Sequence, residues 1–434
     1  MHYGWPSPSL PQLLSQNSTM TVTDSEGSWI AVMMLAGGPV GSIIAGSMID
    51  MLGRKRTILL TAVPFFTSWM MIAFAHMVEI FYVARFVAGV ADGITFIVVP
   101  MYLGEIADPK IRGLLGSSCS VIMTFGILLV NIMGTQIDIR LSALISSIVP
   151  VLLLVTFCWM PESPYYLLMR GRKEEARQNL LMLRGTKDVE DELDRLTNAI
   201  SVQTGGWYWD LFKERNNRKA LLVVIILRTV QQLSGVTAIT FYATMIFAAA
   251  GSDISPNMAT VMYFSVQILM TVVSALMLDK AGRRPLLLVS LTGCAIALTM
   301  EATYYCLDLK INALPVAALV VFIITYCLGL GTVPVLMLGE LFPTKVKTFA
   351  LCIVEVYYCL LAAVSSKFFQ IMKDDFEMFI PFYVFALCCA IGFVLVFVFV
   401  PETKGKTLED IQVYLKGNEQ RHDMKSNSVQ ITYC

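Results

Sequence analysis

The chain has 434 residues, of which 56% are apolar and 15% charged, and its mean hydropathy is +0.68. Soluble domains carry about 25% charged residues, so this chain is depleted in charge. Its long uncharged stretches indicate membrane spans. The 32 basic and 32 acidic residues give a formal net charge of zero, which offers no basis for nucleic-acid binding. The ten cysteines are scattered without metal-ligand or disulfide spacing, so no metal and no cofactor is expected.

The N-terminal stretch Met1–Leu14 contains several prolines and is too short to cross a membrane, since a span needs about 20 residues. It lacks the basic start and apolar core of a signal peptide. If it is the end of a first span, the full design has twelve spans, six on each side of a central loop. Asn17 begins the only glycosylation sequon, which is usable on an extracellular loop.

Apolar runs of membrane-spanning length follow, and we predict eleven of them, at 28–48, 57–76, 79–101, 113–134, 141–160, 219–249, 257–278, 286–306, 314–338, 347–371 and 379–400. Alternate loops hold most of the Lys and Arg, namely those near 50–56, 104–112, 161–218, 279–284, 341–347 and 401–425. The positive-inside rule makes these loops cytoplasmic. The same rule puts the C-terminal tail inside the cell and Asn17 outside.

The predicted organisation is an N-terminal bundle at 1–160, a cytoplasmic linker at 161–218, a C-terminal bundle at 219–400 and a tail at 401–434. In the linker, Lys173–Arg184 and Val189–Gln203 combine helical spacing with dense alternating charge. A solvated helical linker is the simpler interpretation, and a binding site is the alternative. The polar tail after Gln412 is expected to be disordered.

Two charged hinges, Gly46–Arg56 and Leu278–Pro285, each lie between apolar runs. Each has an acid, two residues, a glycine and adjacent cations: Asp50, Gly53, Arg54 and Lys55 in the first, and Asp279, Gly282, Arg283 and Arg284 in the second. Any short cytoplasmic loop collects Lys and Arg. Two copies at matching places favour a different interpretation, in which two related halves rock against each other. Charges this close to hydrocarbon need partners, so ion pairs are expected.

Polar residues inside the spans are candidates for a binding site. Gln231 and Gln232 lie well inside the run 219–249, and Gln267 lies in the next run. Amides in hydrocarbon need several hydrogen-bond partners. Neighbouring helices or the hydroxyls of a sugar would both serve. Neutral polar groups favour an uncharged, hydroxyl-rich solute over an ion.

Charged residues also occur inside or at the ends of spans. Arg85 has no obvious acid partner, and Glu355 either lines a cavity or pairs with a cation. A second repeated pattern lies at the predicted cytoplasmic ends of the spans. There, basic residues follow acids by seven positions: Arg112 after Glu105, and Lys347 after Glu340. We interpret these residues as salt bridges at a gate. No catalytic constellation or phosphate-binding loop is present, so an enzyme is not expected.

The motifs together resemble the sugar porter family of the major facilitator superfamily over nearly the whole chain. They are Asp50–Arg56, Arg85–Gly89, Pro100–Glu105, Arg112-Gly113, Pro161–Pro164, Gln231–Gly235, Asp279–Arg284, Gly339–Pro343 and Pro401–Gly405. The stretch Gly405–Ile411 is most similar to the facilitated trehalose transporters of insects. The resemblance implies an all-α membrane protein with two six-helix bundles, the first helix truncated, and a cytoplasmic helical linker domain. It also implies facilitative transport of a sugar by alternating access.

The resemblance implies roles for particular residues. Gln231 and Gln232 match glutamines that bind sugar hydroxyls, whereas Gln267 and Thr237 stand where asparagine ligands often lie. Ser120 replaces a frequent glutamine, and Tyr358 replaces an asparagine. The candidate site is completed by Thr240, and Glu162 and Glu402 join the gate charges. Val335 replaces a frequent tryptophan, which leaves open whether the sugar is trehalose or a hexose.

The expected partners are a sugar and the lipid bilayer of the cell membrane, and the chain is expected to be monomeric. In related proton symporters, an acid in the first span pairs with the arginine that matches Arg85, and that part of the span is missing here. Two alternatives therefore stay open. One is a proton-coupled sugar symporter, and the other is a sugar sensor that kept the fold without transporting.

Overall fold

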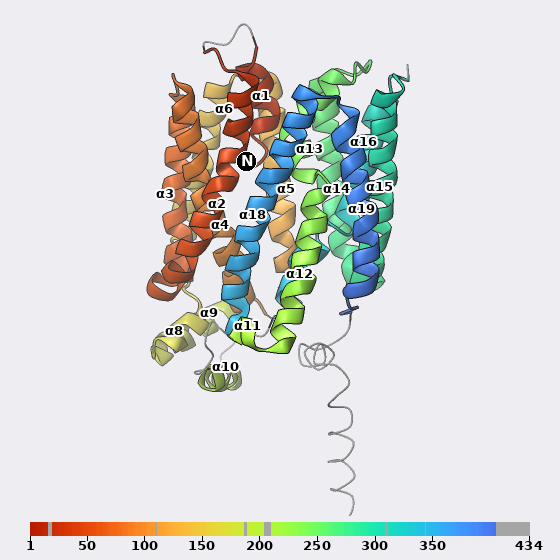
Figure 1. Cartoon of the computed structure of the whole chain (residues 1–434). Helices are drawn as coiled ribbons and strands as arrows, with labels where there is room; N and C mark the ends of the chain where they lie inside the picture. The colour runs from red at the N-terminus through yellow and green to blue at the C-terminus, as the bar shows by residue number, and fades with distance from the viewer. Residues whose placement is uncertain are drawn as a thin grey trace, which may run out of the picture.

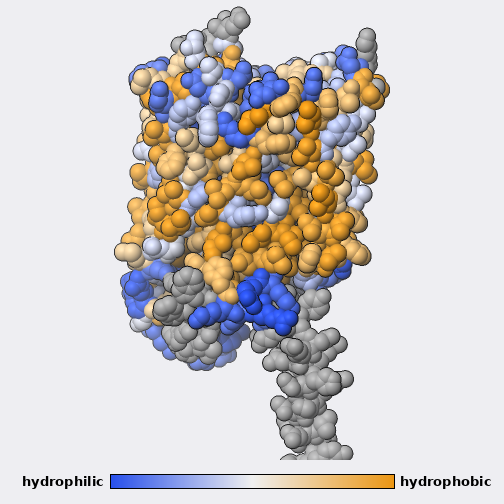
Figure 2. Space-filling model, viewed as in Figure 1, coloured by the Kyte–Doolittle hydropathy of each residue, from blue (hydrophilic) through white to orange (hydrophobic). Residues whose placement is uncertain are grey.

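The computed structural model describes residues 1–15, 20–108, 111–185, 189–203, 210–308, 311–342 and 344–404. These residues form helices and no strand. Eleven of the helical segments within them are long and apolar enough to cross a membrane, which confirms the predicted spans. Figure 2 shows an apolar band around the middle of the molecule and polar residues gathered at its two ends, as a bilayer-spanning protein requires. Asn17 and the tail beyond 404 lie outside the described residues.

The N-terminal bundle is formed by α1 (Pro6–Leu13), α2 (Asp24–Leu52), α3 (Arg54–Ala73), α4 (Val78–Ile106), α5 (Arg112–Gln136), α6 (Ile139–Ser146) and α7 (Ile148–Phe157). The predicted run 141–160 is thus two helices that meet at Ser147. The break is explained by Pro150, which has no amide hydrogen to donate to the carbonyl of Ser146. In Figure 1 these helices stand side by side with long axes roughly parallel.

Helices α2 and α4 pack along each other more closely than ordinary side chains allow. A Cβ atom on Gly41 of α2 would lie 2.1 Å from the carbonyl oxygen of Val90. One on Gly89 of α4 would lie 2.0 Å from the carbonyl oxygen of Met34. Glycine is the residue that lets two backbones approach in this way, so these positions set the spacing of the bundle.

Helix α1 begins inside the bundle rather than at either end, as the N label in Figure 1 shows. Trp5, just before the helix, is fully buried, and Pro6 occupies the first helical position, where its missing N–H costs nothing. The helix packs against α13 of the C-terminal bundle as well as against α5 and α2. The N-terminal segment is therefore part of the packed interior and touches both bundles.

The linker forms α8 (Pro164–Met169), α9 (Lys173–Arg184), α10 (Glu190–Gln203) and α11 (Asp210–Lys213). Helix α9 has the predicted bounds, and α10 begins one residue after the predicted start. A small apolar cluster holds α8 to α9 and α10 through Leu167, Leu180 and Leu193. Figure 1 places these helices at one end of the bundles. Charged side chains of α9 such as Lys173, Glu174 and Glu175 are exposed there.

The C-terminal bundle is formed by α12 (Arg215–Leu233), α13 (Val236–Ala249), α14 (Pro256–Ala281), α15 (Arg283–Cys306), α16 (Leu314–Leu328), α17 (Val333–Leu341), α18 (Thr344–Asp375) and α19 (Phe379–Phe399). Two predicted runs, 219–249 and 314–338, are broken helices: α12 with α13, and α16 with α17. The two bundles meet where α2 packs on α18 and where α5 packs on α14.

The two hinges adopt the same backbone conformation. Gly53 has φ +89° and ψ 175°, and Gly282 has φ +89° and ψ 160°. L-amino acids with a side chain rarely adopt this region, so glycine is required at both. A Cβ atom would also meet a carboxylate, that of Glu162 at 2.5 Å from Gly53 and that of Glu402 at 3.0 Å from Gly282. The duplication expected from the sequence extends to the local geometry.

Candidate functional site

The break between α12 and α13 positions the glutamine pair. Helix α12 ends at Leu233, and Gly235 turns the chain with φ +82° before α13 begins. A Cβ atom on Gly235 would lie 2.3 Å from the ring of Phe385, so no larger residue fits without repacking. Gln231 and Gln232 lie in the last turn before the break, and their side chains are 3% and 0% exposed. Both amides are thus held deep within the C-terminal bundle.

The amide of Gln231 is fully occupied by the protein. Its oxygen accepts a hydrogen bond of 2.8 Å from Nη1 of Arg228, and its nitrogen donates to the carbonyl oxygen of Leu330 at 2.7 Å. The same nitrogen lies 3.3 Å from the hydroxyl of Tyr326. Leu330 belongs to the unwound stretch between α16 and α17. Gln231 therefore links the end of one broken helix to the break in another.

Gln232 differs because half of its amide is free. Its oxygen accepts a hydrogen bond of 2.7 Å from Thr237, whose hydroxyl lies 2.9 Å from that of Tyr3. Its Nε2 is buried without a hydrogen-bond partner among the described residues. The Oε1 atom of Gln267 on α14 is in the same situation. An unpaired buried donor and an unpaired buried acceptor are costly unless a ligand completes them.

The other predicted site residues fall into two groups. Tyr358 on α18 lies under Arg228, with the guanidinium carbon 4.8 Å from the centre of its ring. Arg228 thus brings Gln231 and Tyr358 together. Thr240 is buried on α13, and Ser120 is half-buried on α5, and neither has a side-chain hydrogen bond to the glutamines.

Arg85 is satisfied by backbone carbonyls. Its guanidinium donates to the carbonyl oxygens of His2 at 2.6 Å, Ile30 at 3.3 Å and Ala31 at 3.4 Å. It also lies 5.4 Å from the centre of the Trp5 ring. The expected acid partner is therefore replaced by oxygens from the N-terminal segment and α2, together with a cation–π contact.

Glu355 is buried on α18, and its carboxyl accepts a weak hydrogen bond of 3.7 Å from Sγ of Cys359. Attraction to the nearby cation Arg228 acts against the cost of burying this carboxylate. Both interpretations left open for Glu355, a cavity-lining acid or a partner of a cation, stay predictions. Arg228 lies on α12, one turn before Gln231.

Sequence reasoning overlooked several polar residues that the structure places in the interior. Arg228, Asp92 and Glu301 are charged residues inside predicted spans, and that position alone would have identified them. Glu301 on α15 is 0% exposed, and neither carboxyl oxygen has a hydrogen-bond partner among the described residues. Tyr3 carried no such signal, because its contact with Thr237 joins residues 234 positions apart.

The first hinge lies in a cluster of charges that we call the N-terminal ionic cluster, made of Arg54, Lys55, Glu105, Glu162 and Ser163. The guanidinium of Arg54 donates to Glu105 at 2.9 and 3.1 Å, and the hydroxyl of Ser163 donates to the same carboxylate. The carboxylate of Glu162 accepts from the backbone N–H groups of Arg54 at 3.0 Å and Lys55 at 3.1 Å. The cluster ties α3, α4 and the start of the linker together.

The second hinge repeats this arrangement in the C-terminal ionic cluster, made of Arg283, Arg284, Glu340, Glu402 and Thr403. Arg283 donates to Glu340 at 2.9 Å, and Thr403 donates to the same carboxylate at 2.6 Å. Glu402 accepts from the backbone N–H groups of Arg283 and Arg284, both at 3.0 Å. Each partner in one cluster thus has a counterpart in the other.

Of the remaining gate residues, Asp50 and Lys347 can be described. The carboxylate of Asp50 is exposed and makes no ion pair within the described part of the chain, whereas its backbone carbonyl accepts from Arg170. Nζ of Lys347 lies 3.4 Å from the carbonyl oxygen of Gly339. The side chains of Arg112 and Asp279 lie outside the described part. Among the described side chains, Glu162 and Glu402 of the Pro-Glu motifs hold the hinge backbones, and the carboxylate of Asp50 does not.

Changing Glu402 to glutamine is expected to alter how stability depends on pH. Partial burial acts to raise the pKa of the Glu402 carboxyl, but the N–H groups of Arg283, Lys404 and Arg284 together outweigh it, so the pKa lies below its usual 4.5. A carboxyl with a lowered pKa contributes stability above its unfolded-state pKa and loses it as the pH falls through its folded-state pKa. The variant should therefore melt below the wild type at pH 7, and the gap should close below about pH 4.5.

The melting temperature of the purified protein from pH 7 to pH 3.5 measures this gap. Glu377→Gln is the matched control, because Glu377 is an exposed glutamate near the opposite end of the molecule. An equal and pH-independent gap in both variants would show that the N–H groups at the hinge do not hold Glu402 as a carboxylate.

Residues 9–415 match the family model described as "Sugar (and other) transporter". The chain belongs to the sugar transporter family. It is 37% identical over 434 residues to the facilitated trehalose transporter Tret1 of Drosophila willistoni, a match that covers 97% of this chain and 50% of the relative. The Tret1 of Culex quinquefasciatus is 35% identical, with 97% of this chain and 84% of the relative covered.

The chain thus spans about half the length of the Drosophila relatives that it matches. Among solved structures, it resembles the proton:xylose symporter XylE bound to 6-bromo-6-deoxy-D-glucose, with a TM-score of 0.80 and 22% identity, covering 95% of this chain and 96% of that one. The partially occluded inward-open XylE of E. coli gives the same TM-score and identity, covering 94% and 96%. These likenesses confirm the major facilitator fold of a sugar transporter family member.

Proposed function

We propose that the chain carries an uncharged sugar, trehalose or a hexose, across the cell membrane down its gradient. The observation that carries this proposal is the pair of unpartnered buried polar atoms, Nε2 of Gln232 and Oε1 of Gln267. A hydroxyl group both accepts and donates a hydrogen bond, so a polyol satisfies both kinds of atom. The curated Tret1 relatives, described as facilitated trehalose transporters, support trehalose as the first solute to test.

The proposed mechanism is alternating access between two bundles. Each ionic cluster joins helices within one bundle, Arg54 to Glu105 in the first and Arg283 to Glu340 in the second. Each bundle is therefore braced as a unit at the end that carries the linker. Rocking then takes place where the bundles meet, along α2 with α18 and α5 with α14. The other gate charges, Arg112, Asp279, Lys347 and Arg284, stay proposals as parts of this brace, whereas the exposed carboxylate of Asp50 takes no part in it in this conformation.

Uptake of labelled trehalose and labelled glucose into proteoliposomes that contain the purified protein tests this function. Saturable uptake that stops when the gradient is gone supports a facilitative carrier. Binding of sugar without flux would instead support a sensor that kept the fold. Neither binding nor flux with either sugar would overturn the substrate class.

Proton-coupled symport is the second candidate, because Glu301 is buried without a partner among the described residues and Glu355 lies in the same bundle. Carboxyl groups inside membrane proteins often belong to proton pathways. The same proteoliposomes decide between the two modes. Sugar accumulation against its gradient under an imposed pH difference would establish symport, and simple equilibration would exclude it.

The proposed topology places the linker and tail in the cytoplasm and the Asn17 loop outside, in a monomeric protein of the cell membrane. Supporting it, the linker helices stand at one end of the bundles, and the end of α1 and the start of α2 stand at the other (Figure 1). In glycosylating cells, Asn17→Gln should abolish the size shift that a glycosidase produces in the wild type. A wild type that never shifts would count against an extracellular Asn17 loop.

A further inference from the structure

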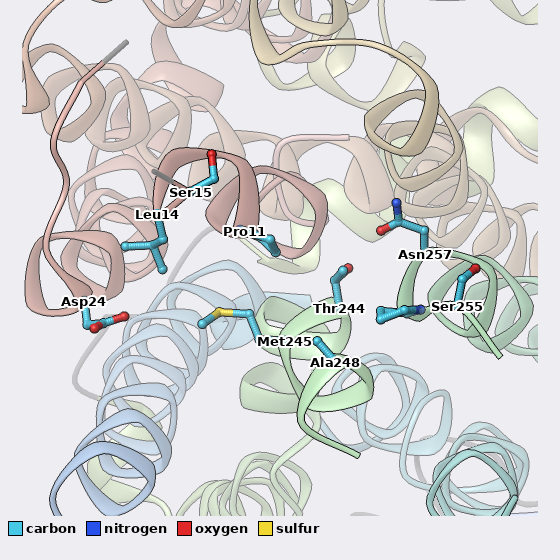
Figure 3. A pocket seen from close by; sticks show the side chains of 10 residues that line it. Pro11, Leu14, Ser15, Asp24, Thr244, Met245, Ala248, Ser255 and Asn257 are labelled. Atoms are coloured by element: carbon cyan, nitrogen blue, oxygen red, sulfur yellow. The ribbon is translucent and has the colours of Figure 1, made fainter. Parts of the chain in front are cut away.

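A hollow lies between the two bundles at the end of the molecule opposite the linker helices. It has a volume of about 530 Å³. Its walls come from the C-terminal end of α1 and the start of α2 in one bundle, and from α13 and the start of α14 in the other (Figure 3). A solute in this hollow would therefore contact both moving parts of the protein.

The side chains of the hollow combine a polar rim with an apolar wall. In Figure 3, Asp24 lies at one end, Ser255 and Asn257 lie at the other, and Met245 and Ala248 of α13 lie between them. A sugar has hydroxyl edges and a C–H face, which suit such a rim and such a wall. The described lining holds one carboxylate and no Lys or Arg, so it favours a neutral polyol over an anion.

A seam between α1 and α13 separates the hollow from Gln232. Directly at the hollow, the hydroxyl of Ser7 lies 3.1 Å from that of Thr244, which also accepts from Thr260 at 3.2 Å. Seven residues earlier on α13, Thr237 contacts Tyr3 and Gln232. Seven residues of helix span about 10 Å, so the hollow and the Gln232 amide are distinct places.

We propose that this hollow is a second, outer binding site for an uncharged, hydroxyl-rich solute, which occupies it before the α1–α13 seam parts. The choice of solute class rests on the proposed function, whereas the existence of the site does not require flux. Because the seam is built from hydroxyl pairs rather than ion pairs, solute hydroxyls can replace its hydrogen bonds as the seam opens.

Thiol protection on the purified full-length protein tests the site directly. Ala248 lines the hollow and is exposed, whereas its neighbour Ala249 is also exposed but lies outside the lining, so the two make a matched pair. Ala248→Cys and Ala249→Cys are labelled with a bulky maleimide, with wild-type labelling subtracted. At twice its dissociation constant, trehalose leaves about a third of sites free, so labelling at position 248 should slow about threefold. Labelling at position 249 should not change.

A third arm separates the hollow from the Gln232 site. In the double variant Ala248→Cys/Gln232→Leu, protection by trehalose should persist, because the ligand at the hollow does not touch Gln232. Protection that disappears in the double variant would mean that trehalose acts from the inner site, and the proposal would be overturned. Equal slowing at positions 248 and 249, or slowing at neither, would overturn it as well.

This design also distinguishes the outer site from the transport proposal. A protein that shows selective protection at position 248 but moves no sugar keeps the outer site and loses the carrier function. A protein that moves sugar without protection at position 248 keeps the carrier function and loses the outer site. Mannitol at the same concentration shows whether an open-chain neutral polyol binds at the hollow or whether a sugar ring is required. Protection by sodium gluconate, but not by trehalose or mannitol, would contradict the proposal that the solute is uncharged.

Discussion

Gln232→Leu is expected to lower saturable sugar uptake about 100-fold, the effect of losing roughly two hydrogen bonds to the substrate. The amide nitrogen of Gln232 is buried and has no partner among the described residues, so a substrate hydroxyl is its proposed acceptor. The protein itself loses little, because Thr237 keeps its contact with Tyr3 at 2.9 Å. Initial uptake in proteoliposomes, normalised to incorporated protein, measures the effect, and the melting temperature should stay close to that of the wild type.

Gln231→Leu provides the contrast on the adjacent residue. It leaves the carbonyl of Leu330 and Nη1 of Arg228 without their Gln231 partner, and each buried unsatisfied group costs about 1–3 kcal/mol. We therefore expect this variant to lose stability together with uptake. A Gln231→Leu protein that melts like the wild type but transports nothing would assign Gln231 to the substrate instead. Undiminished uptake by Gln232→Leu would refute the assigned site.

The repeated features of the fold were predictable because the sequence repeats them. The hinges at Gly53 and Gly282 have the same spacing and the same backbone angles. The sequence placed charges at matching span ends, but the spacing suggested Arg112 and Lys347 as partners of Glu105 and Glu340. The structure instead pairs Glu105 with Arg54 and Glu340 with Arg283. The length of the apolar runs was enough to predict the eleven spans, since each must cross the same apolar thickness of the bilayer.

Contacts between segments far apart in the chain could not be predicted from the sequence. The partner of Gln231 lies 99 residues away at Leu330, on a backbone carbonyl that is free only because α16 ends at Leu328. No side-chain pattern reveals which carbonyl is left unpaired. Tyr3 likewise reaches Thr237 only through the packing of α1 on α13. Asp50 resembled a gate acid by spacing, but the helix end turns its carboxylate to solvent.

These unpredicted contacts bear on how the bundles move. Gln231 and Arg228 of α12 contact the unwound stretch at Leu330, between α16 and α17, and the ring of Tyr358 on α18. These contacts connect the two broken helices and α18 at one depth in the C-terminal bundle. The α1–α13 seam, by comparison, depends on two hydroxyl pairs. Hydroxyl pairs break more easily than a charge-assisted network. A seam held in this way suits the separation of the bundles that the proposed mechanism requires.

Gly41→Ala is expected to destabilise the N-terminal bundle strongly. Its new Cβ atom would lie 2.1 Å from the carbonyl oxygen of Val90 and 3.0 Å from its Cα, and neither backbone atom can rotate away. Helices α2 and α4 would have to separate along their contact, and overpacking of this kind typically costs 1–3 kcal/mol, which lowers the melting temperature by on the order of 5 °C. Thermal unfolding of the purified protein, followed by loss of monodisperse material, measures the shift.

Gly46→Ala is the matched control, because Gly46 lies on the same helix and a Cβ atom there would meet nothing within 4 Å. Alanine is the better helix former by roughly 0.5–1 kcal/mol, so this variant should melt at or slightly above the wild-type temperature. Both variants add the same methyl group to α2, so shifts of opposite sign would show that the contact with α4 decides the effect. If both variants melted alike, helix propensity rather than the contact with α4 would govern the bundle, and close glycine packing would not set its spacing.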